Sequence, residues 1–279
     1  MTTRSPYDIA NFTTESFATL LAAGPGVVAL VAVGSVEPHG PHLSLITDTV
    51  ISAAVVARAA ELLAVLSSHN VAPIIAPSVN YGVTDCAVGF AGALSIPAFA
   101  LTEYLRAVAA ALLAAGCRLV CLVNNHLEPE HDRAVRAATG PGVIVACPLT
   151  RRWARTLSAE FKSGQCHAGE YETSIVLAAD PSLVVVPRLA TLPSVPISLS
   201  QGLAAGKNTF AAMGMSDAYA GNPAAATAVE GQAMIELLAQ MVVGEVTVAL
   251  DAIEITVEST LRWAAVVAAA LGRFAHMCG

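Results

Sequence analysis

Four apolar runs punctuate the first half of the chain. They cover residues 27–33, 71–76, 118–123 and 143–147, and the first is wholly aliphatic. Short runs of this kind are typical of strands buried on both faces of a parallel sheet. Longer stretches between the runs, many of them bounded by Gly or Pro, predict helices at residues 13–23, 48–66, 97–115 and 129–138. Asp48 or Thr49 is expected to cap the second of these helices.

The second half of the chain is predicted to be mostly helical, with one edge strand at residues 184–186 and an irregular region at 187–222. Helices are expected at residues 153–161, 169–179, 224–243 and 251–275. Strands that alternate with helices predict an α/β fold, in which helices cover both faces of a mainly parallel sheet. We therefore expect a three-layer α/β/α sandwich, formed by one domain over residues 1–279. Residues 244–279 are expected to be a C-terminal helical extension.

Composition limits the functions that this domain can have. The 279 residues suit one large domain, 55% are hydrophobic, and only 13% are charged. A net charge of -7 argues against nucleic acid as a partner, since nucleic acid requires a basic face. The six Cys form no C-x-x-C pair, no signal core opens the chain, and the apolar runs look too short to span a membrane, so we expect a cytoplasmic protein. The weakly polar, Ala-rich surface predicts a homo-oligomer.

Charged side chains gather after two of the predicted strands. The first strand leads into Glu37, His39 and Asp48, and the third leads into His126 and Glu128. Because the carboxyl ends of parallel strands meet at one edge of a sheet, these groups are expected to lie close together. Three carboxylates and two imidazoles exceed what one tetrahedral zinc requires. They suit two divalent ions that share a bridging carboxylate.

Four segments occur in an order that carries a more specific resemblance. They read G-S-x-E-x-H-G-P-H-L-x-L-x-T-D at 34–48, N-H-L-E at 125–128, H-A-G-x-x-E-T-S at 167–174 and G-N-P-x-x-A-T-x-x-x-G at 221–231. Together they resemble the motifs of the creatininase family of metal-dependent amidohydrolases, over about residues 14–243.

The resemblance implies an α/β/α sandwich with two divalent ions at the carboxyl edge of the sheet, Zn or Mn, with Fe as an alternative. By motif, Glu37, Asp48 and His126 would hold one ion. His39, Asp48 and Glu128 would hold the other, with Asp48 bridging. A hydroxide between the ions would attack the carbonyl carbon of a small cyclic amide or a formamide, and the C–N bond would then break.

The resemblance also implies roles for further residues near the ions. His167 is expected to transfer a proton to the leaving nitrogen. Glu128 is expected to take part in catalysis as well as to bind metal. Glu172 is expected either to orient a ligand or His167, or only to complement the helix dipole. His42 is expected either to be structural or to contact the metal ligands without binding metal itself.

The remaining histidines carry no comparable pattern. His131 and Glu130 are expected on a solvated helix face. His69 and His276 are expected at the surface.

The substrate walls depart from creatininase itself. Leu127 stands where creatininase has an aromatic residue, and residues 161–166 lack the Trp and acidic groups of that enzyme. Together with Cys166 and Tyr81, this predicts a less aromatic, fairly neutral pocket and a small-molecule substrate other than creatinine. Lys162 and the pair at 151–152 could offer charge to an anionic substrate, but solvated surface is the preferred interpretation for each.

Two alternatives remain open at the level of sequence. The same metals could hydrolyse a lactone or a cyclic sugar-derived ketone, or the chain could be an inactive metal-binding scaffold subunit. The resemblance further implies a hexamer built as a trimer of dimers.

Overall fold

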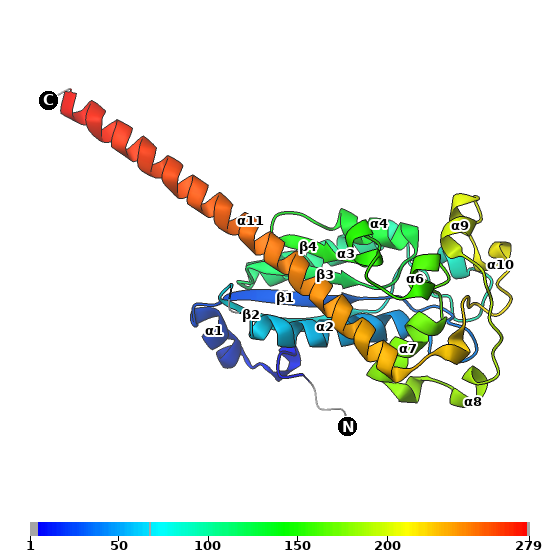
Figure 1. Cartoon of the computed structure of the whole chain (residues 1–279). Helices are drawn as coiled ribbons and strands as arrows, with labels where there is room; N and C mark the ends of the chain where they lie inside the picture. The colour runs from blue at the N-terminus through cyan, green and yellow to red at the C-terminus, as the bar shows by residue number, and fades with distance from the viewer. Residues whose placement is uncertain (1–4, 67, 278–279) are drawn as a thin grey trace.

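A four-stranded parallel sheet forms the centre of the molecule (Figure 1). The computed structural model describes residues 5–66 and 68–277, with side chains as far as residue 256. The strand order is β2-β1-β3-β4. The strands are β1 (Gly26–Val33), β2 (Val71–Val79), β3 (Leu119–Asn124) and β4 (Val143–Ala146). β2 runs past Pro77, beyond its predicted end, because it lies at the sheet edge, where a missing N–H is tolerated.

Side chains that alternate along β1 build two cores. Val28, Leu30 and Ala32 pack on one face, under α2 (Thr47–Ala64), α7 (Glu170–Ala179) and α11 (Ala228–Met277). The residues between them pack on the other face, under α1 (Thr14–Ala22), α3 (Ala98–Ala114) and α4 (Pro129–Ala137). A strand buried on both faces explains its continuous apolar sequence. The expected α/β/α sandwich is confirmed.

Short helices replace some of the elements that the sequence pattern predicts. The single helix expected at residues 153–161 is divided into α5 (Arg151–Ala154) and α6 (Ala159–Ser163), because Ser158 caps a new start. The edge strand expected at 184–186 is absent from the described sheet. Val184 forms only an isolated bridge with Leu43. The other short helices are η1 (Ile9–Asn11), η2 (Asp85–Ala87), η3 (Pro181–Leu183), α8 (Val186–Leu189), α9 (Leu199–Ala204), α10 (Phe210–Met213) and η4 (Pro223–Ala225).

The two helices predicted near the C-terminus form one continuous helix, α11, which extends beyond the sheet (Figure 1). Gly244 lies inside it, where a Cβ would come 3.2 Å from the Trp153 ring. A single Gly weakens a helix by only about 1 kcal/mol relative to Ala. Residues Ala228–Thr256 are long and apolar enough to cross a membrane by composition, yet 44% of the most apolar window is buried. The contacts of α11 with α7 and α2 explain this apolarity as that of a core helix.

His69 and His131 are both buried, so their predicted solvation was wrong. His69 is 7% exposed, and its Nε2 lies 3.4 Å from Asp251 Oδ1 on α11. Its Nδ1 lies 3.6 Å from Glu254 Oε1. These contacts join segments far apart in the sequence, which local patterns do not record. Glu130 is exposed as predicted, and the side chain of His276 lies outside the described residues.

The strand order decides where the site forms. β1 lies between β2 and β3. The chain adds β2 on one side of β1 and then returns to add β3 on the other side, so the direction in which strands are added reverses at β1. The crevice at the carboxyl ends of such strands is the usual ligand site of a doubly wound sheet. The segments that follow β1, β2 and β3 all open into this crevice.

Candidate metal centre

The segment after β1 places three polar side chains in the interior. Glu37, His39 and Asp48 are each 2% exposed or less. Gly34 allows this, because a Cβ there would lie 2.5 Å from the backbone nitrogen of Thr49. The prediction that Asp48 or Thr49 caps α2 was wrong. The helix starts at Thr47 without a side-chain cap, and the Asp48 carboxylate is engaged by imidazoles instead.

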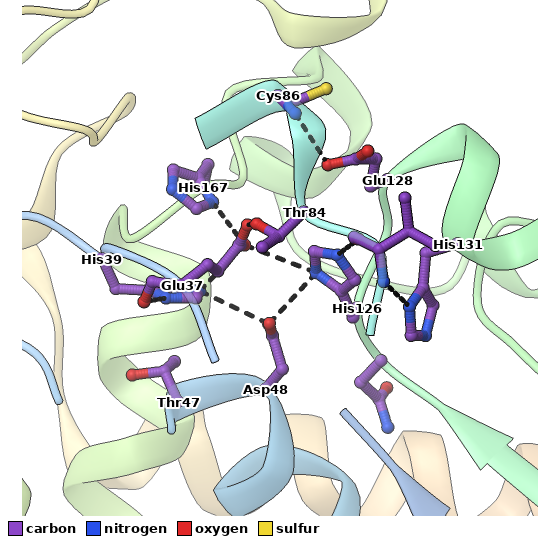
Figure 2. Close-up of polar contacts among 12 residues, drawn as sticks. Glu37, His39, Thr47, Asp48, Thr84, Cys86, His126, Glu128, His131 and His167 are labelled. Atoms are coloured by element: carbon purple, nitrogen blue, oxygen red, sulfur yellow. Dashed lines mark hydrogen bonds and ion pairs between the residues drawn. The ribbon is translucent and has the colours of Figure 1, made fainter. Parts of the chain in front are cut away.

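Asp48 lies between two histidines that come from different strand ends (Figure 2). Its Oδ1 is 3.3 Å from His39 Nε2, and its Oδ2 is 3.0 Å from His126 Nδ1. Glu37 Oε1 is 3.3 Å from the same nitrogen of His126. The Asp48 carboxylate therefore presents one oxygen to the His39 imidazole and the other to the His126 imidazole. This is the arrangement expected of a carboxylate that bridges two metal ions.

Backbone carbonyls orient three imidazoles around this carboxylate. His39 Nδ1 lies 3.1 Å from the carbonyl oxygen of Glu37, and His126 Nε2 lies 2.7 Å from that of Val83. His167 Nε2 lies 3.1 Å from the carbonyl oxygen of Pro38. Because a carbonyl only accepts, the N–H of each ring must face it. The other nitrogen of each ring faces the carboxylates, and once deprotonated it would present a lone pair there, as in a metal ligand.

Glu172 and Glu128 take different places from those that the motifs imply. Glu172 Oε2 lies 3.6 Å from His39 Nε2 and accepts an N–H from Ala168, whose φ of 51° is rare for a residue other than Gly. Both oxygens of Glu128 accept backbone N–H groups at 3.0 Å from the segment after β2. Glu172 therefore groups with His39 and Asp48, whereas Glu128 groups with Glu37 and His126.

The buried charges shift one another's pKa. Burial alone would raise the pKa of Asp48 and Glu37, but the charge of His126 holds both below their usual values. Burial would lower the pKa of His39, but Asp48, then Glu172 and Glu37, raise it to about 10. Burial would also lower the pKa of His126, but Glu37 and then Asp48 raise it well above its usual value. Without metal, the centre is thus held together by protonated imidazoles.

Burial shifts the pKa of each surrounding group in the direction of its neutral form. Burial raises the pKa of Glu172 to about 8 and also raises that of Glu128. Burial, followed by the charge of His39, lowers the pKa of His167 to about 4. His42 lies outside the cluster, as expected, with Nε2 at 3.0 Å from Thr173 Oγ1.

These residues fit divalent metal. His39 Nε2 and Asp48 Oδ2 are buried and form no hydrogen bond of good geometry among the described residues; their polar neighbours are the ion-pair contacts at 3.3 Å and 3.0 Å. Buried polar atoms held only in this way are costly unless something binds them. Imidazole nitrogens and carboxylate oxygens are the usual donors to Zn²⁺ and suit Mn²⁺ as well.

Several supporting residues carried no recognisable signal in the sequence. The Thr84 hydroxyl donates to Glu37 Oε2. His131 Nδ1 accepts the N–H of Val83 at 3.2 Å, and its ring packs edge-on against His126 with centroids 4.5 Å apart. Only the folding of the segment after β2 against α4 brings these groups to the site.

A cavity of about 700 Å³ opens above the cluster, and its lining corrects the predicted pocket. Leu127 and Cys166 line it as expected, but Tyr81 does not. Phe161 and Phe210 add aromatic surface, and four cationic side chains line the wall. The expectation of a fairly neutral wall was wrong.

Comparison with known proteins agrees with the motifs. Residues 10–246 match the model of a family described as creatinine amidohydrolase. A mycofactocin precursor peptide peptidase from Mycobacterium ulcerans is 33% identical over 219 residues, which cover 76% of this chain and 80% of that protein. The chain belongs to the creatininase family.

Other creatininase relatives are more distant. The creatinine amidohydrolase of Pseudomonas putida is 25% identical over 66% of this chain and 76% of its own. A solved creatininase structure superposes with a TM-score of 0.64 at 22% identity, covering 88% of this chain and 97% of the other. Related solved structures are described as manganese and zinc–zinc forms. At this identity the superposition shows the fold alone.

Proposed function

We propose that this protein hydrolyses an amide C–N bond with the help of two divalent ions. The observation that supports it best is the position of Asp48, which presents one oxygen to His39 and the other to His126. Fixed ring orientations and membership of the creatininase family point the same way.

We assign the ligands by proximity rather than by motif order. Glu37, Asp48 and His126 hold one ion, and His39, Asp48 and Glu172 hold the other. Zinc and manganese are the ions that this donor set favours. When bound, such a pair polarises the scissile carbonyl and acidifies water.

Glu128 is the proposed proton carrier. Its burial raises its pKa, and the N–H groups of Asp85 and Cys86 fix its carboxylate beside Glu37 and His126. It takes a proton from the attacking water and returns it to the leaving nitrogen. This assignment replaces the proton-transfer role that the motifs imply for His167.

His167 is proposed to position the substrate. Its lowered pKa keeps the ring neutral, and its Nε2–H faces the carbonyl of Pro38. Its Nδ1 lone pair, 3.8 Å from Glu37 Oε1, is free to accept an N–H from the substrate amide. The Phe210 ring, with its centroid 4.3 Å away, supports the imidazole from behind.

A peptide or peptide-like amide is the proposed substrate size. The cavity of about 700 Å³ is in the range that holds drug-sized ligands. The relatives that are 31–33% identical are named as peptidases of a precursor peptide. A small cyclic amide or formamide is the second candidate, favoured by the creatinine amidohydrolase relative.

The test combines metal analysis with a substrate panel. Protein reconstituted with zinc or manganese is expected to hold about two ions per chain. It should hydrolyse members of a panel of short peptides, cyclic amides, formamides, lactones and esters, and chelation should abolish this activity. Turnover of lactones alone would instead support the lactonase alternative. Bound metal that raises the melting temperature without any turnover would support the scaffold alternative.

We also propose that the chain forms a homo-oligomer. Phe99 and Tyr104 on α3 are 73% and 56% exposed in the single chain, and Val88 nearby in the sequence is 59% exposed. Light scattering tests this, and a monomeric mass at micromolar concentration would contradict it.

A further inference from the structure

The wall of the cavity differs in charge from its floor. The floor carries the four carboxylates of the metal centre, whereas the wall carries Arg133, Arg136, Arg155 and Lys162. The whole chain has only 14 Lys and Arg and a net charge of -7. Four of these few cations therefore line one cavity, while Asp132 is the one acid among its described residues away from the floor.

The four cations form two pairs with different surroundings. Arg136 Nε donates to Asp132 Oδ2 at 2.8 Å, and Arg133 pairs with Glu130, so the charges on α4 are balanced. Arg155, which ends α5, and Lys162 in α6 form no ion pair with any residue that the structure describes. This second pair is thus available to a ligand.

The rest of the wall is apolar. α9 and α10 lie at the same end of the molecule as α4 and α6 (Figure 1) and contribute Leu199, Leu203, Phe210 and Met213. Two divalent ions would balance the four floor carboxylates. The cavity would then present a positive potential above an apolar surface, which favours an anion with an apolar body.

We propose that the cavity selects amides that carry a carboxylate, which Arg155 and Lys162 bind while the apolar wall holds the body of the substrate. This inference rests on the proposed function, because the metal centre defines where the scissile amide lies. It deepens that function from amides in general to anionic amides, such as peptides with a free C-terminus.

The test separates the anion site from the metal centre. The probes are the monohydroxamate of suberic acid and its methyl ester, which carry the same metal-binding hydroxamate and differ at the far end only in charge. Isothermal titration calorimetry on zinc-loaded protein measures both. We expect the acid to bind about fivefold to tenfold more tightly than the ester, and this preference to shrink at high salt.

The Arg155→Gln/Lys162→Gln double variant should bring the two probes to equal affinity and leave the affinity for the ester unchanged. Arg151→Gln is the matched control, because Arg151 is an exposed cation of the same segment that does not line the cavity. It should keep the preference for the acid.

Each outcome decides one proposal. Equal binding of acid and ester by the unmodified protein overturns the anion site and leaves the metal centre intact. A preference that survives in the double variant overturns the assignment to these two residues. If neither probe binds, the metal centre itself is wrong, and the anion site falls with it.

Discussion

The floor and the wall of the cavity are built in opposite ways. On the floor, Glu37, His39 and Asp48 are almost completely buried. Backbone carbonyls contact His39 Nδ1 and His126 Nε2, the ring nitrogens that face away from the carboxylates. On the wall, Arg155 and Lys162 are exposed side chains of short helices, next to apolar surface. Rigid placement suits groups that must hold metal within tenths of an ångström, whereas exposed charges suit recognition.

This difference in burial predicts which substitutions should be severe and which should be mild. A buried charge that loses its partner destabilises its neighbours strongly, while an exposed pair contributes little. Substitutions on the floor should therefore abolish metal or chemistry, and substitutions on the wall should only change substrate preference.

The largest effect is expected from Asp48→Ala, which removes the carboxylate between both imidazoles. The variant should lose both ions and reduce kcat/KM about 10³-fold or more. Elemental analysis and kinetics measure this. Asp132→Asn, a carboxyl on the wall of the same cavity, is the control and should keep its metal. Retention of two ions by Asp48→Ala would remove the bridging role.

Glu128→Gln and Glu172→Gln should separate chemistry from metal binding. Glu128→Gln is expected to keep about two ions and to lower kcat by about 10²-fold to 10⁴-fold, because only the proton carrier is lost. Glu172→Gln should lower the metal content to about one ion. The reverse pattern, with metal lost from Glu128→Gln, would restore the ligand set that the motifs imply.

Metal affinity should depend steeply on pH. His39, with a pKa raised to about 10, and His126, also raised, must each release a proton to bind metal. Glu172, with a pKa raised to about 8, must also release its proton below that pH. Between pH 7 and 8 we expect affinity to rise about 100-fold or more per pH unit, with roughly two to three protons released in calorimetry. A pH-independent affinity would contradict the assignment of both imidazoles as ligands.

The metal-free protein should show the opposite trend. Because the folded pKa of His39 lies above the unfolded value of about 6.5, its stabilising effect is complete below that pH. It is lost as the pH rises through about 10. Thermal unfolding of chelated protein across this window should show a falling Tm.

A smaller effect is expected from His131→Phe, which keeps a ring beside His126 but removes the acceptor for the Val83 N–H. Metal affinity should fall about tenfold, as is usual when support behind a ligand is lost. His69→Phe is the control. It should lower Tm through its contacts with α11 and leave metal affinity unchanged. An unaltered affinity in His131→Phe would show that its bond to Val83 does not position His126.

Sequence predicted the floor better than the wall. The apolar strands and the motif residues Glu37, His39, Asp48 and His126 follow local rules, since parallel strands must bring their carboxyl ends together. The family motifs implied Glu128 as the partner of His39 and Asp48, whereas Glu172 is the carboxylate that lies 3.6 Å from His39. Spacing along the chain does not show which of two carboxylates turns towards His39.

The contacts between segments that lie far apart in the sequence are visible only in the tertiary structure. The support of Glu37 by Thr84, the burial of His131 and the gathering of cations on one wall all join parts of the chain that no short pattern connects. Solvent exposure depends on how the helices and strands pack together. The local sequence around a charged or imidazole side chain therefore does not show whether that side chain faces water, metal or substrate. The amino-acid sequence thus determined the sheet and most of the groups proposed to bind metal. The fold determined their partners, their protonation and the charge of the cavity above them.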